Sequence, residues 1–241
     1  MTDDLHTLDI SSGERWPDRV ADVMAAAIAD AVTRNGRCIM ALSGGSTPAP
    51  AFEALAAHDE LPWESVTILQ VDERMVPADD PARNLIQQQQ AFAALGVEWL
   101  PLPIDELLSV AGQKDTEARS AAVIDRFCMQ LIELAGEPPI LDLVHLGLGD
   151  DGHTASLVPG DPLLNEMRDY VGMTELYNGT RRLSLTRPVL DRARMVVWLV
   201  SGASKAEPLG RLLAGDMTIP AGLIRPAHSV VLADTDSARQ G

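Results

Sequence analysis

Residues 143–160 read LVHLGLGDDGHTASLVPG, an apolar run followed by closely spaced glycines and an Asp-Asp-Gly-His turn. The apolar run has the length of a buried strand, and Thr154 and Ser156 stand where a helix could begin. This order places the imidazole of His153 at the carboxyl end of a strand, where open α/β proteins bind their ligands. The stretch therefore predicts both a fold class and the position of a functional site.

The rest of the chain alternates apolar runs of strand length with segments of helical periodicity. Strands are expected at residues 38–42, 66–71, 141–148, 195–200 and 229–233. Helices are expected at residues 16–34, 48–57, 84–95, 116–135 and 204–214, the first of them ending near Asn35-Gly36. Strands that alternate with helices need crossover connections, which produce a parallel sheet. The prediction is an α/β fold, a Rossmann-like three-layer sandwich whose mostly parallel sheet carries helices on both faces.

Length and composition favour a single domain over residues 1–241. A chain of 241 residues with 46% hydrophobic content suffices for one large α/β core. The stretch 161–192 is less regular, and RRLSLT at 181–186 is expected to form an antiparallel strand at an edge or flap. No internal repeat or convincing linker divides the sequence.

The charge balance excludes several classes of partner. Asp and Glu number 35 against 19 Lys and Arg, a formal charge of −16, so the overall field repels nucleic acid and anionic membrane surfaces. We expect no nucleic-acid partner and no membrane partner. An anionic ligand must then be held by a local cluster of donors.

The first residues and the cysteines indicate the cellular compartment. The start, MTDDLHTLDI, has acidic residues where a signal peptide has a basic region, and no later stretch approaches 18 uninterrupted apolar residues. Cys38 and Cys128 are too few for a disulfide framework and suit a reducing compartment. A cytoplasmic location is expected, and the oligomeric state, monomer or small homo-oligomer, stays open.

A glycine turn follows the strand predicted at 38–42. It reads Ser43-Gly44-Gly45-Ser46-Thr47-Pro48 and opens the next helix. Glycines let backbone N–H groups approach an anion, and the helix N-terminus adds partial positive charge, so the turn is a candidate phosphate cradle. The alternative is an ordinary glycine turn capped by Ser or Thr, because the lysine of a P-loop is missing.

Charged residues follow the strand predicted at 66–71. Asp72, Glu73 and Arg74 come first, and Arg83 and Asn84 precede the next helix. Arg74 and Arg83 could hold a phosphate with forked hydrogen bonds, while Asn84 could cap the helix or bind substrate. Salt bridges at the surface are the alternative for both arginines.

The Asp-Asp-Gly-His turn supplies a candidate base. Either Asp150 or Asp151 can accept a hydrogen bond from the His153 imidazole, which would leave the other ring nitrogen free for general-base work near neutrality. A structural or surface role is preferred for the remaining histidines, which lack such a setting: His6, His58, His145 and His228.

A fourth strand end carries Ser201-Gly202-Ala203-Ser204-Lys205-Ala206. Ser204 could cap a helix there, and Lys205 could project a cation toward the same rim. Alone this is an ordinary strand-turn-helix, but beside the other three segments it supplies a cation that a sugar phosphate would need.

These segments, in this order, resemble the signature segments of 6-phosphogluconolactonases. The resemblance rests on residues 43–48, 71–77, 147–160 and 201–206, which span most of the chain. It implies the Rossmann-like fold shared with glucosamine-6-phosphate deaminases and hydrolysis of 6-phospho-D-glucono-1,5-lactone, the second step of the oxidative pentose phosphate pathway. The partner would be a small-molecule sugar phosphate.

The deaminases are the main competing reading. They resemble the chain in the Ser-Gly-Gly turn and the Asp-Gly-His corner, but they follow the histidine with Ile-Ala-Phe-Asn-Glu-Pro, and Val158 occupies the Glu position here. They also tend to carry Asp-Glu-Tyr where this chain has Arg74. Lactonases in turn commonly have Ser-Asn where this chain has Arg83-Asn84, which leaves the role of Arg83 open.

The resemblance suggests a mechanism. His153, oriented by Asp151, would take a proton from the water that attacks the lactone carbonyl, and would then protonate the departing ring oxygen. The expected substrate and phosphate ligands are Ser43, Gly44, Gly45, Thr47, Asp72, Arg74, Asn84 and Lys205. No cofactor and no metal is expected, because Asp150, Asp151 and His153 share one turn without a second ligand cluster. Two alternatives are not enzymes: a sugar-phosphate sensor without catalysis, and a dinucleotide-binding module.

Overall fold

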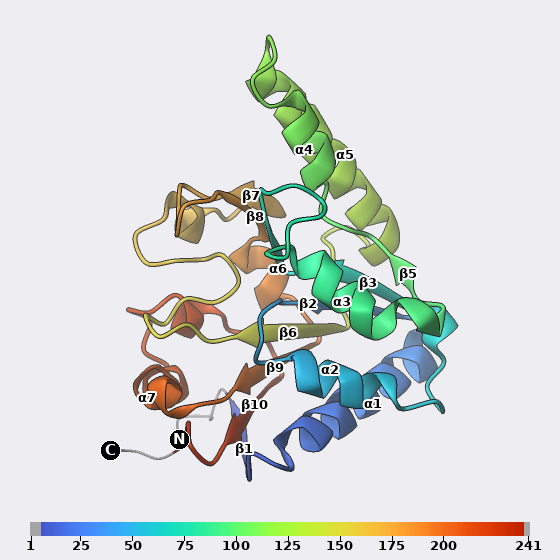
Figure 1. Cartoon of the computed structure of the whole chain (residues 1–241), viewed down its shortest axis with the longest axis vertical. Helices are drawn as coiled ribbons and strands as arrows, with labels where there is room; N and C mark the ends of the chain where they lie inside the picture. Colours follow the sequence, from blue (N-terminus) through green and yellow to red (C-terminus); the bar gives the residue numbers. More distant parts are fainter. Residues whose placement is uncertain (1–5, 239–241) are drawn as a thin grey trace.

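A seven-stranded parallel sheet forms the centre of the computed structural model, which describes residues 6–238 (Figure 1). Its strands lie in the order β1 (Thr7–Ser11), β10 (Ser229–Asp234), β9 (Met195–Val200), β6 (Leu143–Gly147), β2 (Cys38–Leu42), β3 (Val66–Gln70) and β5 (Glu98–Trp99). Neighbouring strands pair in parallel across the sheet. The five predicted strands are all present, with bounds that shift by two residues at most.

The predicted helices are also present. They are α1 (Trp16–Asn35), α2 (Ala49–Ala56), α3 (Asn84–Phe92), α5 (Thr116–Ala135) and α7 (Ala206–Leu213). Helix α1 ends where expected, because Gly36 adopts the left-handed conformation with φ 72° and its N–H bonds the carbonyl of Val32. The short α6 (Arg187–Asp191) was not predicted.

Alternate side chains of the central strands divide the core into two halves. On β2, Met40 and Leu42 pack with α1, α2 and Phe92 of α3, whereas Ile39 and Ala41 pack on the opposite side with α5, α6 and α7. Period-two alternation with full burial on both sides is what a parallel sheet between two helical layers requires. The three-layer prediction is confirmed.

A second, smaller sheet lies beside the functional end of the main one. Its antiparallel strands are ordered β4 (Asp72–Arg74), β8 (Arg182–Leu185) and β7 (Val171–Met173). The strand expected at 181–186 is therefore real and antiparallel, although it is the central strand of this small sheet rather than an edge of the large one. Since β4 follows β3 after a single residue, Val71, the small sheet is tied directly to the carboxyl edge of the main sheet.

Several elements escaped the sequence reading. Strand β1 lies at the edge of the sheet and exposes Leu8 and Ile10, so its register is held by ladder hydrogen bonds more than by burial. Helix α4 (Ile104–Val110) and α5 form a helical hairpin that projects from the body (Figure 1). The remaining short pieces are 3-10 turns: Trp63–Ser65, Ala93–Leu95, Pro162–Asn165, Ala203–Lys205 and Ala221–Leu223.

The helix expected to start at Thr154 and Ser156 does not form, so that expectation was wrong. Residues 154–157 make a tight turn closed by a Thr154–Leu157 bridge, with Ala155 at φ 52°. The Thr154 hydroxyl donates to the carbonyl of Gly147, and the Ser156 hydroxyl donates to the Asp72 carboxylate. Both side chains are used in long-range contacts, so neither caps a helix.

The order of the strands creates a crevice. Strand β2 lies between β3 and β6, and the chain turns first toward β3 and later to the opposite side at β6. At such a switch point the connections leave the sheet in opposite directions, which opens a ligand site beyond the carboxyl ends of the two strands. Within residues 6–238, none of the helices has both the length and the apolar content to cross a membrane.

Candidate active site

A cavity of about 210 Å³ opens at this switch point, beyond the carboxyl ends of β2 and β6. The residues predicted to bind substrate or phosphate all line it: Ser43, Gly44, Gly45, Thr47, Asp72, Arg74, Asn84 and Lys205. The candidate base His153 lines it as well. Asp151 stands behind His153 rather than in the wall.

Asp151 is the carboxylate that orients the imidazole. Its Oδ1 lies 2.5 Å from Nδ1 of His153 and also accepts the His153 backbone N–H at 3.1 Å. Burial alone would raise the pKa of the Asp151 carboxyl, but the hydrogen bonds from His153 outweigh it and the pKa is lowered. An ionised Asp151 fixes the proton of a neutral imidazole on Nδ1, so Nε2 becomes the proton acceptor.

Gly149 makes room for this arrangement. A Cβ at Gly149 would lie 2.0 Å from Nδ1 of His153, and the Gly149 N–H donates to the His153 carbonyl at 2.8 Å. The ring therefore packs directly on the backbone of the loop that follows β6. This is a close approach that only glycine permits.

Asp150 has a separate task. Its Oδ1 pairs with Nζ of Lys205 at 2.5 Å and accepts from the Ser204 hydroxyl at 3.2 Å. The hydrogen bond from Lys205 lowers the pKa of the Asp150 carboxyl. The two neighbouring carboxylates of this turn thus hold different side chains of the cavity wall: Asp151 holds His153, and Asp150 holds Lys205.

The glycine turn after β2 is held by the helix that follows β4. A Cβ at Gly44 would lie 1.9 Å from Oδ1 of Asn84, and the Gly45 N–H donates to Oε1 of Gln87 at 2.9 Å. The Ser43 hydroxyl donates to the carbonyl of His145 at 3.1 Å. Gly44 therefore satisfies a packing requirement as well as exposing backbone to the cavity.

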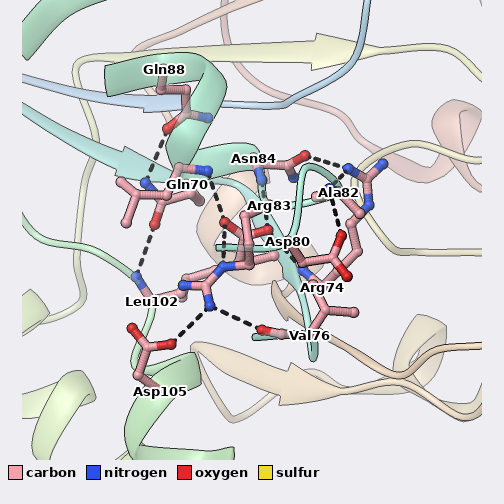
Figure 2. Close-up of polar contacts among 12 residues, drawn as sticks. Gln70, Arg74, Val76, Asp80, Ala82, Arg83, Asn84, Gln88, Leu102 and Asp105 are labelled. Atoms are coloured by element: carbon pink, nitrogen blue, oxygen red, sulfur yellow. Dashed lines mark hydrogen bonds and ion pairs between the residues drawn. The ribbon is translucent and has the colours of Figure 1, made fainter. Parts of the chain in front are cut away.

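Glu73 and Asn84 place Arg74 at the cavity edge. The buried Glu73 carboxylate accepts the backbone N–H groups of Asn84 and Leu85, each at 2.8 Å, and so caps α3. Asn84 donates to the Asp72 carbonyl at 2.7 Å. It accepts from Nη1 of Arg74 at 2.7 Å (Figure 2). Nη1 also donates to the carbonyl of Ala82 at 2.7 Å, which fixes the guanidinium.

Arg83 is a structural residue. Its side chain is only 3% exposed, lies 3.4 Å from Oε2 of Glu73, and pairs with Asp105 at 2.9 Å. It also donates to the carbonyl of Val76 at 3.1 Å, and Figure 2 shows it directed away from Arg74. Arg83 is absent from the cavity wall, and its salt bridges lie in the interior rather than at the surface. Arg74 lines the cavity.

Sequence reasoning missed Tyr177 and Arg182. The Tyr177 ring lies 5.7 Å from the His153 ring at 67°, and its hydroxyl donates to Oδ2 of Asp151 at 3.4 Å. The Arg182 guanidinium lies 4.7 Å from the centre of the Tyr177 ring. A signal was present, because Asn178-Gly179 is the dipeptide typical of a two-residue hairpin turn.

His145 was assigned a structural role, and the structure buries it at the floor of the cavity. Its side chain is 1% exposed, and neither ring nitrogen has a hydrogen-bond partner among residues 6–238. Burial lowers the pKa of His145 to about 3. The His145 side chain is therefore uncharged in the folded protein near pH 7.

The comparison with known families agrees with this geometry. A profile of the glucosamine-6-phosphate isomerases/6-phosphogluconolactonase family matches residues 11–233. The chain belongs to this family.

Relatives in the glucosamine-6-phosphate isomerases/6-phosphogluconolactonase family match nearly end to end. A 6-phosphogluconolactonase of Synechocystis sp. is 37% identical over 208 residues, 85% of this chain and 84% of the relative. One of Nostoc sp. is 34% identical over 223 residues, 88% of this chain and 90% of the relative. The crystal structure of 6-phosphogluconolactonase from Leishmania guyanensis has a TM-score of 0.81 and covers 97% of this chain and 98% of its own, at 23% identity. That likeness shows the shared fold.

Proposed function

We propose that the chain hydrolyses 6-phospho-D-glucono-1,5-lactone to 6-phospho-D-gluconate, a reaction of the oxidative pentose phosphate pathway. The observation that carries the proposal is the Asp151–His153 pair, whose base faces a cavity that also holds Arg74 and Lys205. The names of the relatives support it. On this proposal residues 1–241 act as one cytoplasmic domain, as a monomer or small homo-oligomer.

His153 is the general base of the proposed reaction. Its Nε2 takes a proton from water, the water attacks C1 of the lactone, and the imidazolium returns the proton to the departing ring oxygen. Asp151 stabilises the imidazolium that forms in between. Backbone N–H groups of the glycine-rich loops are the proposed donors to the oxyanion at C1.

The phosphate of the substrate is proposed to lie between the glycine turn and the two cations. Ser43, Gly44, Gly45 and Thr47 supply the turn, while Asp72 and Asn84 complete the wall beside Arg74. Arg74 and Lys205 oppose the repulsion expected from a chain of charge −16. Holding the phosphate also positions the distant lactone carbonyl for attack.

A deaminase in the same family is the alternative. Val158, at the position where deaminases carry Glu, is only 5% exposed and has an apolar side chain that can neither donate nor accept a proton. The chain therefore lacks, at this position, the Glu carboxylate that deaminases carry.

Two assays distinguish the readings. Hydrolysis of freshly generated 6-phosphoglucono-δ-lactone is followed by proton release against its spontaneous rate, and glucosamine 6-phosphate is tested in parallel for ammonia release. We expect acceleration of the first reaction only. Ammonia release without lactone hydrolysis would assign the chain to the deaminases, and no turnover of either would favour a sugar-phosphate sensor.

Arg74→Ala is expected to weaken substrate binding more than it slows turnover. Loss of a charge-assisted contact to phosphate should raise KM about tenfold or more, with a smaller change in kcat. Steady-state kinetics on the lactone give both constants. Arg181→Ala is the matched control, because this substitution removes the same charge. Arg181 is half-exposed and, among the described carboxylates, pairs only with the exposed Glu175. An unchanged KM in Arg74→Ala would remove Arg74 from the phosphate site.

Chelation is expected to leave the rate unchanged. Asp150 is committed to Lys205 and Asp151 to His153, and no group of three or more metal-ligating side chains occurs within residues 6–238. The lactone rate is measured before and after dialysis against a chelator, with re-addition of divalent ions. A loss that metal restores would contradict the metal-free proposal.

A further inference from the structure

A hairpin of the small sheet brings a tyrosine against the back of the candidate base. Tyr177 and Thr180 form a bridge around Asn178 and Gly179, whose φ angles are 50° and 80°. Positive φ at both central residues is what a type I′ turn requires, and this turn suits the twist of the strands that it joins. The hairpin therefore presents Tyr177 from a tight turn rather than from a loose loop.

Tyr177 contacts both members of the Asp151–His153 pair. Asp151 uses Oδ1 for the imidazole and the backbone N–H of His153, and Oδ2 accepts the Tyr177 hydroxyl at 3.4 Å. The Tyr177 ring also meets the His153 ring, with 5.7 Å between the centroids. The Tyr177 ring also receives the Arg182 guanidinium at 4.7 Å from its centre, a cation–π contact that restrains it.

Tyr177 does not belong to the wall of the cavity. It reaches the reacting atoms only through Asp151 and His153. Burial and the negative charge of Asp151 raise the pKa of the Tyr177 phenol, so its hydroxyl remains a donor near neutral pH.

We propose that Tyr177 is a positioning residue of this enzyme, which holds the Asp151 carboxylate with its hydroxyl and the His153 ring with its own ring, and thereby sets the basicity of His153. The proposal rests on the proposed lactonase function for its kinetic consequences. The Tyr177 hydroxyl takes up part of the carboxylate charge that would otherwise stabilise the imidazolium. Removing it should therefore make His153 more basic.

Other charges also act on His153, and the test keeps them constant. The titratable and charged side chains of its own loop and of the facing elements are Asp150, Asp151, Lys205, Asp72, Arg74, Tyr177 and Arg182. Tyr177→Phe removes one hydroxyl and leaves all the other groups in place. The phenyl ring of the variant can still meet His153 and Arg182.

The decisive measurement is the pKa of His153 in Tyr177→Phe, followed by NMR of the imidazole and assigned by the loss of its signal in His153→Gln. We expect a rise of roughly 0.3 to 1 pH unit, because the hydrogen bond from Tyr177 is long, at 3.4 Å, and acts on the imidazole only through Asp151. The acid limb of kcat/KM should move to higher pH by the same amount. KM should change less than about twofold, since Tyr177 lies outside the cavity wall.

Tyr177→Ala removes the ring as well. We expect the same direction of pKa shift and a fall of about tenfold in kcat, because the imidazole loses its lateral support. Tyr170→Phe is the matched control: Tyr170 is the other of the two tyrosines in the chain and also donates to a carboxylate, Glu137, at 2.8 Å. It should leave the pKa of His153 and the pH profile unchanged.

The outcomes separate this inference from the function on which it rests. If wild-type protein does not hydrolyse the lactone, the proposed function fails, while the NMR titration still tests the contact. If Tyr177→Phe leaves the His153 pKa within about 0.1 unit of wild type, the inference is overturned even in an active enzyme. A rise in KM with an unmoved pH profile would also overturn it, because it would make Tyr177 a substrate contact.

Discussion

His153→Ala is expected to lower kcat for lactone hydrolysis by about two to four orders of magnitude, the usual contribution of a positioned general base. The residue has the geometry for that role: Asp151 holds Nδ1 at 2.5 Å, and the side chain, 29% exposed, borders the cavity. The alanine variant keeps Arg74 and Lys205, so substrate should still bind with similar affinity. Initial rates by proton release, corrected for spontaneous hydrolysis, measure the loss.

Two comparisons make the His153 result specific. His228→Ala removes an exposed histidine outside the cavity and should retain wild-type kcat. Asp151→Asn should give an intermediate loss, because the amide cannot stabilise the imidazolium as a carboxylate does. Wild-type turnover in His153→Ala, in a variant whose thermal midpoint shows that it is folded, would rule out His153 as the base.

Much of this site could be predicted because its residues stand at strand ends. Parallel strands bring their carboxyl ends to one edge of the sheet, so the polar segments after residues 42, 71 and 147 had to lie near one another once the alternating pattern was recognised. The buried strands were equally clear, since full burial on both faces demands continuous apolar runs.

The division of work between side chains could not be predicted. Asp150 and Asp151 are adjacent and chemically identical, and only the path of the loop turns one toward Lys205 and the other toward His153. The sequence likewise does not separate the roles of Arg74 and Arg83. In the structure the buried Arg83 guanidinium pairs with the buried Glu73 and with the exposed Asp105. These outcomes depend on three-dimensional contacts that no local pattern contains.

Elements without a buried periodic face were also missed. Strand β1 exposes alternate apolar residues at the edge of the sheet, and β5 has only two residues. The Tyr177 hairpin has strands too short for a periodicity to be read, although its Asn-Gly turn was visible. The failed helix at Thr154 has the opposite cause, since good capping residues were used for tertiary hydrogen bonds.

The protein is expected to lose stability steeply in mild acid, and His145 is expected to carry much of that loss. Burial lowers the pKa of His145 from 6.5 to about 3 in the folded protein. Between these values the unfolded chain binds a proton that the folded protein does not. The free energy of unfolding is therefore highest above pH 6.5 and falls as the pH drops, by about 1.4 kcal/mol per pH unit from this group.

Other buried groups contribute to the same slope. Burial lowers the pKa of His6 to about 4, so His6 acts in the same direction over a narrower range. The wild-type slope alone cannot separate the two histidines. Comparison of wild type with a variant at position 145 isolates the effect of that one side chain.

His145→Leu is expected to stabilise the protein, and more so as the pH falls. At pH 7 the variant removes an imidazole whose nitrogens have no partner among residues 6–238, which should raise the free energy of unfolding by about 1–3 kcal/mol. Leucine suits a strand position that packs against Phe52, whose ring lies 5.4 Å from the imidazole. The Ser43 hydroxyl keeps its acceptor, because that acceptor is the backbone carbonyl of residue 145.

Urea unfolding of wild type and His145→Leu at pH 7 and pH 5 measures both parts of this prediction. The difference between the two proteins should widen by roughly 2 kcal/mol over that interval, since only the wild type must keep an uncharged imidazole buried. His228→Ala is a control, because His228 is exposed at the surface. The same difference in unfolding free energy at pH 7 and pH 5 would contradict the prediction. It would mean that the imidazole of His145 reaches a proton donor or water in solution, and that other groups cause the acid sensitivity.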